Sequence, residues 1–249
     1  MALTDPLFFV LVLTALLTSM LSGVLGMGGG ATLLGAMSLV LPSSSVVPLH
    51  AVVQLVSNLT RTLALLKKVR WAFALPFILG LPFGLIVARF VMEWMSGPNR
   101  FDSLKGVIGV VLLLFLLLRK KGPKRLHLPR WGFFPLGFFG GLIALFVGAL
   151  GPFVSPFFLR EDLEPEEIVA TKAASLFLAH LLKIPAMLSL GFSYAVYAAP
   201  LGILCICVVV GTLLGRAILA KVKRETFVKL FEAVLFILGV TLIAQSLFF

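Results

Sequence analysis

The stretch LFFVLVLTALLTSMLSGVLGMGGGATLLGAMSLVL, residues 7–41, decides the fold of this chain. Residues 7–25 form an almost continuous apolar run of the length that a helix needs to cross the hydrocarbon of a bilayer. The run ends at the glycine-rich break GMGGG, residues 26–30, and the apolar piece that follows is too short to cross alone. The stretch therefore predicts a membrane helix that is followed by a broken or re-entrant helix.

The rest of the chain repeats this pattern of long apolar blocks. Its composition, 60% hydrophobic and 12% charged, leaves too little polar surface for a water-soluble globule. Because an open strand cannot satisfy its backbone in lipid, we expect every block to be a helix and the chain to be an all-α polytopic membrane protein. The further blocks are residues 49–66, 71–94, 104–118, 132–150, 153–159, 168–190, 194–219 and 227–248.

A second break, GALGP at residues 148–152, indicates an internal repeat. A shift of 122 residues aligns the two breaks and also several positions elsewhere: Gly26 with Gly148, Gly29 with Gly151, Asn58 with His180, Arg61 with Lys183 and Gly80 with Gly202. We expect two repeats, residues 1–125 and 126–249, within one membrane domain. Each would be a broken-helix hairpin followed by three transmembrane helices.

The distribution of positive charge predicts how the repeats are oriented. The formal net charge of +11 resides mostly in short loops, which is typical of membrane topology rather than of nucleic-acid binding. If each short piece folds back on the helix before it, nearly all loop cations share one face, and the other face carries only Arg89, Arg100 and Lys105. If each broken segment instead crossed the membrane once, the loop cations would be divided equally between the two faces, which does not follow the positive-inside rule. The hairpin arrangement makes the repeats inverted in topology and the basic face cytoplasmic.

A polar stripe on residues 49–66 carries the candidate site. Its members recur at helical spacing and project from one face: His50, Gln54, Ser57, Asn58 and Arg61. The corresponding block of the second half carries Lys172, Ser175, His180 and Lys183. Because an inverted repeat with broken helices is typical of secondary transporters, we expect the substrate at the midplane between the halves.

The charge of this stripe favours an anionic substrate. A charge inside the membrane is costly unless it finds a partner or lines a cavity, and acidic residues are scarce away from segment ends. We therefore expect Arg61 and Lys183 to lack protein counterions and to bind an anion. The backbone N–H groups at Gly28, Gly29, Gly30 and Gly151 would contribute at half-helix N-termini. Alternatively, these glycines serve only close helix packing.

Other interpretations stay open for individual residues. Arg61 could snorkel to the headgroups near Lys67, and for Lys172 we expect snorkelling. We expect Lys183 to be buried. His50 and His180 could be satisfied core histidines, donate hydrogen bonds to substrate, or carry a coupled proton.

Three features together resemble the TauE/SafE family of sulfite and organosulfonate exporters: Gly26-x-Gly28-Gly29-Gly30, the weaker Gly148-x-x-Gly151-Pro152, and the basic loop before Trp71. The resemblance covers essentially the whole chain. It implies a bacterial inner-membrane carrier that exports a small sulfur-containing anion. Leu150 stands where a third glycine is common in the family, and Cys205 and Cys207 lie outside the broken helices, which argues against the cysteine relay of related thiosulfate importers.

Other functional classes fit less well. An anion channel could use the same cations around a continuous pore, and saturable flux would distinguish a carrier from it. An intramembrane enzyme is disfavoured because all three Asp lie at segment ends and no His-Glu-x-x-His motif is present. We expect no cofactor and no metal, with the sulfur-containing anion and membrane lipids as partners, and the sequence leaves a homodimer open.

Overall fold

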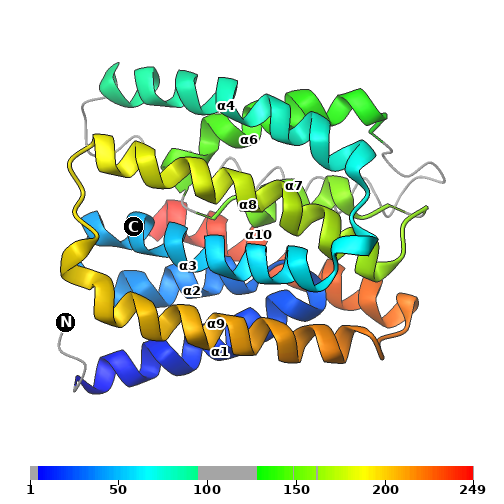
Figure 1. The fold of residues 1–249 in the computed structure, drawn as a ribbon, viewed down its shortest axis with the longest axis horizontal. Coiled ribbons are helices and arrows are strands. Elements are labelled where there is room, and N and C mark those ends of the chain that lie inside the picture. The colour runs from blue at the N-terminus through cyan, green and yellow to red at the C-terminus, as the bar shows by residue number, and fades with distance from the viewer. Residues whose placement is uncertain (1–4, 95–127, 148, 161, 249) are drawn as a thin grey trace.

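The computed structural model describes residues 5–94, 128–147, 149–160 and 162–248, and every regular element in them is a helix (Figure 1). This confirms the predicted all-α class. The α-helices are α1 Pro6–Leu25, α2 Gly29–Val40, α3 Ser43–Ala64, α4 Trp71–Trp94, α6 Phe133–Val147, α7 Gly151–Phe158, α8 Pro165–Ser189, α9 Ala198–Leu219 and α10 Arg224–Phe248. Short 3-10 turns are η1 Leu66–Lys68, η2 Arg130–Gly132 and η3 Ala195–Tyr197. The predicted segment 104–118 and the glycine at position 148 lie outside the described residues.

Each predicted break separates a helix from a shorter one that runs back beside it. In Figure 1, α2 returns toward the end of the molecule where α1 begins, and α7 likewise reverses the direction of α6. That each half forms a re-entrant hairpin as the unit of an internal repeat stays a prediction. Four described helices are long and apolar enough to cross a membrane, and α2 and α6 are shorter apolar helices.

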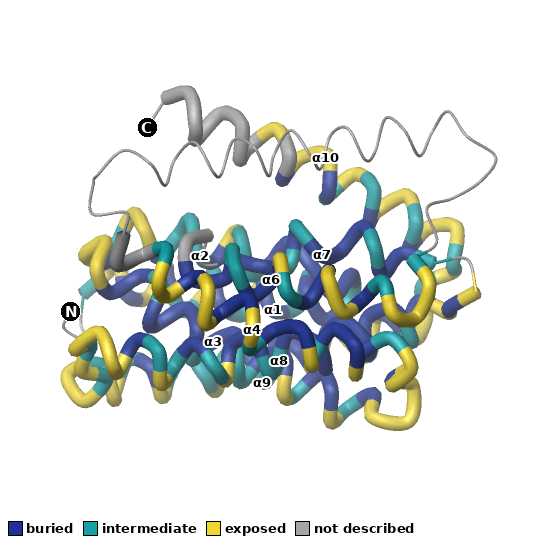
Figure 2. The backbone as a smooth tube through the Cα atoms, turned by 90° about the horizontal axis from the view of Figure 1, so that it is seen from above, coloured by how far each residue is buried: buried dark blue, intermediate teal, exposed yellow. Residues whose placement is uncertain are grey.

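Helices α3 and α8 pack against each other in the middle of the bundle. On one side α9 packs on α3 and α1, and on the other side α4 packs on α8 and α6 (Figure 1). Buried backbone fills the interior, while exposed backbone lies at the ends and outer faces (Figure 2). If the chain is a repeat, α1 corresponds to α6 and α4 to α9. The α1–α9 pair then corresponds to the α6–α4 pair, and both pairs are in contact. The repeat and its boundary near residue 125 stay predictions.

Glycines let the outer pairs approach to backbone contact. A Cβ on Gly84 of α4 would overlap the carbonyl oxygen of Phe138 on α6, and one on Gly211 of α9 would overlap the carbonyl of Leu16 on α1. In lipid, where burial of apolar surface gives no driving force between helices, such close packing is what holds them together.

This packing predicts unequal effects at two glycines that the repeat aligns. A Cβ on Gly80 would overlap the Phe134 carbonyl of α6, whereas one on Gly202 would meet no atom within 4 Å. We expect Gly80→Ala to lower the melting temperature of the detergent-purified protein, at a cost of about 1–3 kcal/mol for overpacking. Gly202→Ala should leave it unchanged or raise it slightly, because alanine is the better helix former. Equal melting temperatures for the two variants would contradict the α4–α6 interface.

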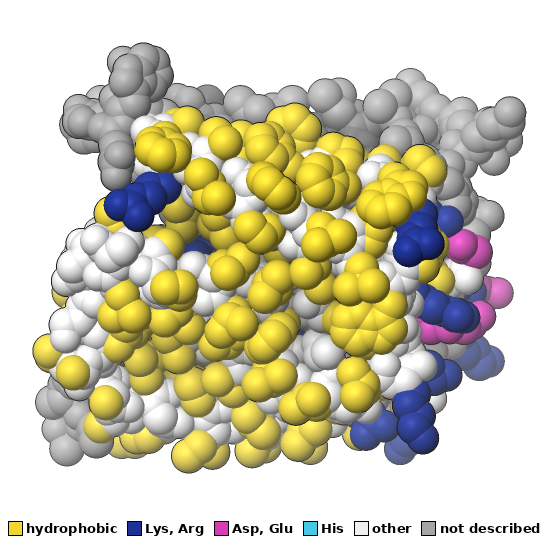
Figure 3. Space-filling view, turned by 45° about the horizontal axis from the view of Figure 1, so that its top comes forward, with side chains coloured by type: hydrophobic (Ala, Val, Ile, Leu, Met, Phe, Trp, Pro, Cys, Tyr) yellow, Lys and Arg dark blue, Asp and Glu magenta, His cyan; other side chains and the backbone are white. Residues whose placement is uncertain are grey.

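The described loop cations gather at one end of the bundle. Ion pairs there join the two halves, with Lys68 Nζ 3.3 Å from Glu166 Oε2 and Arg70 Nη2 2.6 Å from Glu167 Oε1. Figure 3 shows Lys, Arg, Asp and Glu side chains concentrated at this end of a largely apolar face. Glu164 and Glu167 form a capping box on α8, and the acidic residues at the start of α8 also pair with the basic loop after α3.

Candidate functional site

A small cavity lies where the two helix breaks meet α3 and α8. Its volume of about 20 Å³ is room for roughly one water molecule. It is lined by Ser22, Gly26, Met27, Gly28, Gly30, Ala31, His50, Gln54, Asn58, Arg61, Ala149, Leu150, Gly151, Pro152, Leu176 and His180. Both halves of the chain therefore contribute to one polar pocket inside the bundle.

The first break is built on two glycines in the left-handed region. Gly26, with φ 69°, ends α1 as its C-cap and donates its N–H to the Ser22 carbonyl, and Gly28, with φ 88°, precedes α2. Residues with a Cβ rarely adopt these angles. The first amides of α2 have no carbonyl of their own helix to bind, and its positive dipole end borders the cavity.

The second break reaches the same cavity by another route. Helix α7 begins at Gly151 with Pro152 in its first turn, and its N-cap Leu150 has ordinary right-handed angles. Proline suits this position because its missing N–H would be unpaired there in any case. Since α2 and α7 also contact each other, two helix N-termini converge on the cavity.

Arg61 projects from α3 into the cavity and is only 2% exposed. Its Nη1 donates to Asn58 Oδ1 at 3.1 Å and its Nη2 to Ser57 Oγ at 3.0 Å. Its Nε has no partner among the described residues. The alternative that Arg61 snorkels to the headgroups is wrong, because the guanidinium is held inside the bundle by its own helix.

Two histidines face each other across the cavity. The rings of His50 and His180 are 6.0 Å apart, and His50 Nε2 lies 2.8 Å from the carbonyl oxygen of Gly30. Because a carbonyl only accepts, Nε2 must carry the proton of a neutral His50. The Nδ1 atoms of both rings are buried and have no partner in the described part of the chain.

Lys172 is a buried cation for which the sequence predicted snorkelling, and that prediction is wrong. Its side chain is fully buried on α8, and Nζ donates to Ser155 Oγ of α7 at 2.8 Å and lies 5.1 Å from the centre of the Phe231 ring. It lies beside the first break, since a Cβ on Gly26 would be 3.3 Å from Nζ. Its charge is also close enough to interact with that of Arg61.

The predicted site residues fall into two groups. Those that line the cavity are Gly28, Gly30, His50, Gln54, Asn58, Arg61, Gly151 and His180. The four that do not line it are Gly29, Ser57, Ser175 and Lys183.

The four residues that do not line the cavity contact other parts of the structure. A Cβ on Gly29 would overlap the Thr18 carbonyl, so this glycine allows α2 to pack against α1. Ser57 contacts Arg61 and Thr212, and Ser175 donates to the Thr171 carbonyl. Lys183 is fully buried and interacts electrostatically with both cavity histidines.

Sequence reasoning assigned no role in the site to Lys172 or Ser155. A signal for both was present: Lys172 precedes His180 by eight residues, which is about two helical turns, and Ser155 follows the second break by one helical turn. Neutral groups alone hydrogen-bond Arg61 and Lys172 within the described residues. The arrangement therefore concentrates positive charge and amide donors around one pocket, which suits a small anion.

Comparison with known families agrees with this chemistry. A protein-family model described as sulfite exporter TauE/SafE matches residues 11–242. No curated protein and no solved structure matches the chain.

Proposed function

Because the chain belongs to the TauE/SafE family of membrane transporters, we propose that it is a secondary carrier that exports a small sulfur-containing anion such as sulfite or an organosulfonate. The family and the apolar helices make it an integral membrane protein. For its location we propose a bacterial inner membrane, with the basic end of the bundle in the cytoplasm.

The observation that carries this proposal is that helix N-termini and the buried Arg61 meet at one cavity, with the buried Lys172 beside its lining residue Gly26. Arg61 and Lys172 are buried with neutral hydrogen-bond partners, and the N-termini of α2 and α7 point their dipoles at the same place. Burial of positive charge is costly unless a counterion offsets it. An oxyanion with several acceptor oxygens would satisfy the guanidinium, the ammonium and the backbone amides together.

Three further residues contribute to the proposed site. Gln54 packs against Gly30: a Cβ on Gly30 would be 3.2 Å from the side-chain amide of Gln54. This amide therefore lies beside the first turn of α2. Lys183 would act through space, because it raises the positive potential at His50 and His180. Ser57 would hold the Arg61 guanidinium in its orientation.

Transport would require the cavity to expand and open. Its volume is too small for sulfite, and at the basic end two ion pairs join the loop between α3 and α4 to α8. In the proposed alternating-access cycle, one half rocks against the other and these ion pairs break when the cytoplasmic side opens. Pro82 in α4 and Pro185 in α8 are the proposed bending points.

The histidines are the proposed route for a coupled proton. A neutral His50 that donates from Nε2 to Gly30 presents an unprotonated Nδ1, which would repel an anion. Uptake of a proton at Nδ1 would convert this atom into a donor. Binding of the anion and of a proton would then favour each other.

Binding is tested by the thermal stability of the detergent-purified protein in sulfite, sulfoacetate, taurine, thiosulfate, sulfate and chloride. At 100 times the dissociation constant, a bound anion stabilises by roughly 2.7 kcal/mol. We expect sulfite or one sulfonate to raise the melting temperature selectively and Lys183→Ala to reduce that shift. Equal shifts with chloride and sulfite would indicate an ionic-strength effect and would contradict a selective site.

A further inference from the structure

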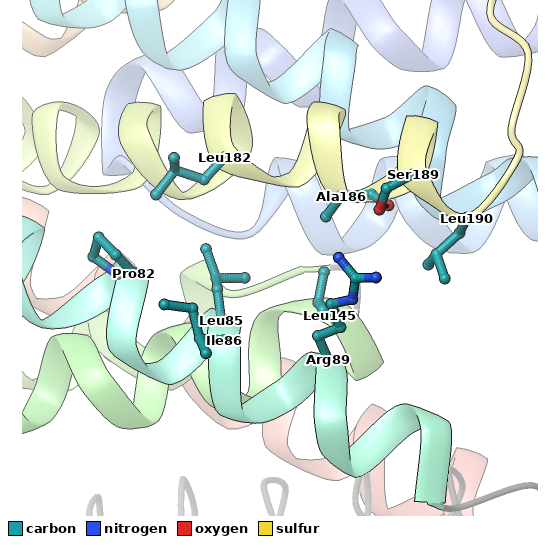
Figure 4. Close-up of a pocket in the computed structure, with 9 residues that line it drawn as sticks. All are labelled: Pro82, Leu85, Ile86, Arg89, Leu145, Leu182, Ala186, Ser189 and Leu190. Carbon is teal, nitrogen blue, oxygen red and sulfur yellow. Dashed lines mark hydrogen bonds between the residues drawn. The ribbon is translucent and has the colours of Figure 1, made fainter.

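A second pocket opens between α4 and α8, away from the cavity between the helix breaks (Figure 4). Its volume is about 360 Å³, within the range of small-molecule pockets. It is lined by Pro82, Leu85, Ile86, Arg89, Leu145, Leu182, Ala186, Ser189 and Leu190. We call this pocket the α4–α8 groove. It shares no lining residue with the cavity between the helix breaks.

The groove has an apolar end and a cationic end. Pro82, Leu85 and Leu182 line one end, while the guanidinium of Arg89 lies at the other, near Ser189 (Figure 4). A ligand that fits this arrangement has an alkyl chain and an anionic head.

Helix packing explains why the groove exists at this place. At the basic end, Lys68 and Arg70 tie the start of α4 to Glu166 and Glu167 of α8. Farther along, α4 follows α6 instead, because Gly80 and Gly84 bring those two backbones into contact. Helices α4 and α8 therefore separate toward the end that carries Arg89 (Figure 1).

The groove opens on an apolar outer surface of the kind that faces lipid in a membrane protein. Phe83 and Phe90 on α4 and Leu188 on α8 are more than half exposed beside it. Arg89 is 18 residues beyond Trp71, which corresponds to about 27 Å along the helix axis. Because the hydrocarbon of a bilayer is about 30 Å thick, the guanidinium lies near the headgroups of the leaflet opposite the basic end.

We propose that the α4–α8 groove binds one acyl chain of an anionic phospholipid, whose phosphate contacts Arg89. A guanidinium forms paired hydrogen bonds with phosphate oxygens, and the Ser189 hydroxyl lies within the same polar end. The aliphatic lining accepts the chain. This lipid site is separate from the proposed carrier site, and its occupancy does not depend on which anion is transported.

The test counts lipids bound to the purified protein in an uncharged detergent by native mass spectrometry. The probes are phosphatidylglycerol, phosphatidylcholine and glycerol phosphate. We expect one tightly bound phosphatidylglycerol, weaker binding of phosphatidylcholine and no binding of glycerol phosphate. Arg89→Gln should weaken phosphatidylglycerol binding roughly fivefold, the effect of one cation near the headgroups.

Two further variants distinguish the groove from general surface attraction. Arg216→Gln is the matched control, because Arg216 is an exposed arginine in the last turn of α9 and does not line the groove. It should bind phosphatidylglycerol as the wild type does, while Ala186→Phe, which fills the groove, should lose the lipid with Arg89 intact. Equal losses in Arg89→Gln and Arg216→Gln, retention of the lipid by Ala186→Phe, or binding of glycerol phosphate alone would overturn the proposal. If Ala186→Phe does not fold, Leu182→Trp fills the same groove.

Discussion

Replacing Arg61 with alanine is expected to abolish the stabilisation of the protein by its sulfur-containing anion. The guanidinium lines the cavity between the two helix breaks, and Asn58 and Ser57 hold two of its nitrogens in place. A hydrogen bond to a charged group contributes about 1.5–3 kcal/mol. If the guanidinium donates two such bonds to the anion, their loss would weaken anion binding by roughly 100-fold or more. The measurement is anion-dependent thermal stabilisation of the detergent-purified variant.

Two controls accompany this variant. Arg61→Lys should bind weakly but measurably, because lysine keeps the charge and loses the planar fork of donors. Arg216→Ala removes an exposed arginine at the end of α9 and should respond to the anion as the wild type does. An unchanged shift in Arg61→Ala would show that the anion does not bind at this arginine.

Lys172→Met is expected to have opposite effects on stability and on binding. The ammonium is fully buried on neutral partners, Ser155 and the ring of Phe231, and interacts with the charge of Arg61. Replacing a buried charge on neutral partners with an apolar side chain of similar length removes the cost of keeping that charge out of water. Without the anion, the variant should therefore melt no lower than the wild type. The anion concentration that gives half of the full stabilisation should rise at least tenfold.

These two measurements, the melting temperature without anion and the response to the anion, distinguish a ligand-binding cation from a structural one. If Lys172 served only to hold α7 against α8, Lys172→Met would lower the melting temperature and leave the anion response intact. Lys229→Met, at an exposed position on α10, is the matched control and should change neither quantity.

Most helix boundaries were predictable because apolar block length and helix breakers determine them. The glycine break after α1 fell within a residue or two of its predicted place, since only glycine suits the positive φ angles at Gly26 and Gly28. The polar stripe on α3 was equally readable, because His50, Asn58 and Arg61 follow the helical period.

Roles that depend on neighbouring helices were not predictable. Lys172 was expected to snorkel because it stands near the start of a predicted segment, but α8 begins earlier, at Pro165, and α7 and α10 cover that position. Gly29 and Gly30 are adjacent in the sequence, yet one faces α1 and the other faces Gln54. A single sequence contains the helical period but not the partner that each face meets.

The central claim is tested most directly by sulfite flux in proteoliposomes that contain the purified protein. If the protein is a secondary carrier with its site at Arg61, efflux of preloaded sulfite will saturate with concentration. Efflux will also be inhibited by the organosulfonate that stabilises the protein, and it will be absent in Arg61→Ala. Flux that rises linearly with sulfite concentration would indicate a channel and contradict alternating access. Saturable flux that persists in Arg61→Ala would contradict the proposed site.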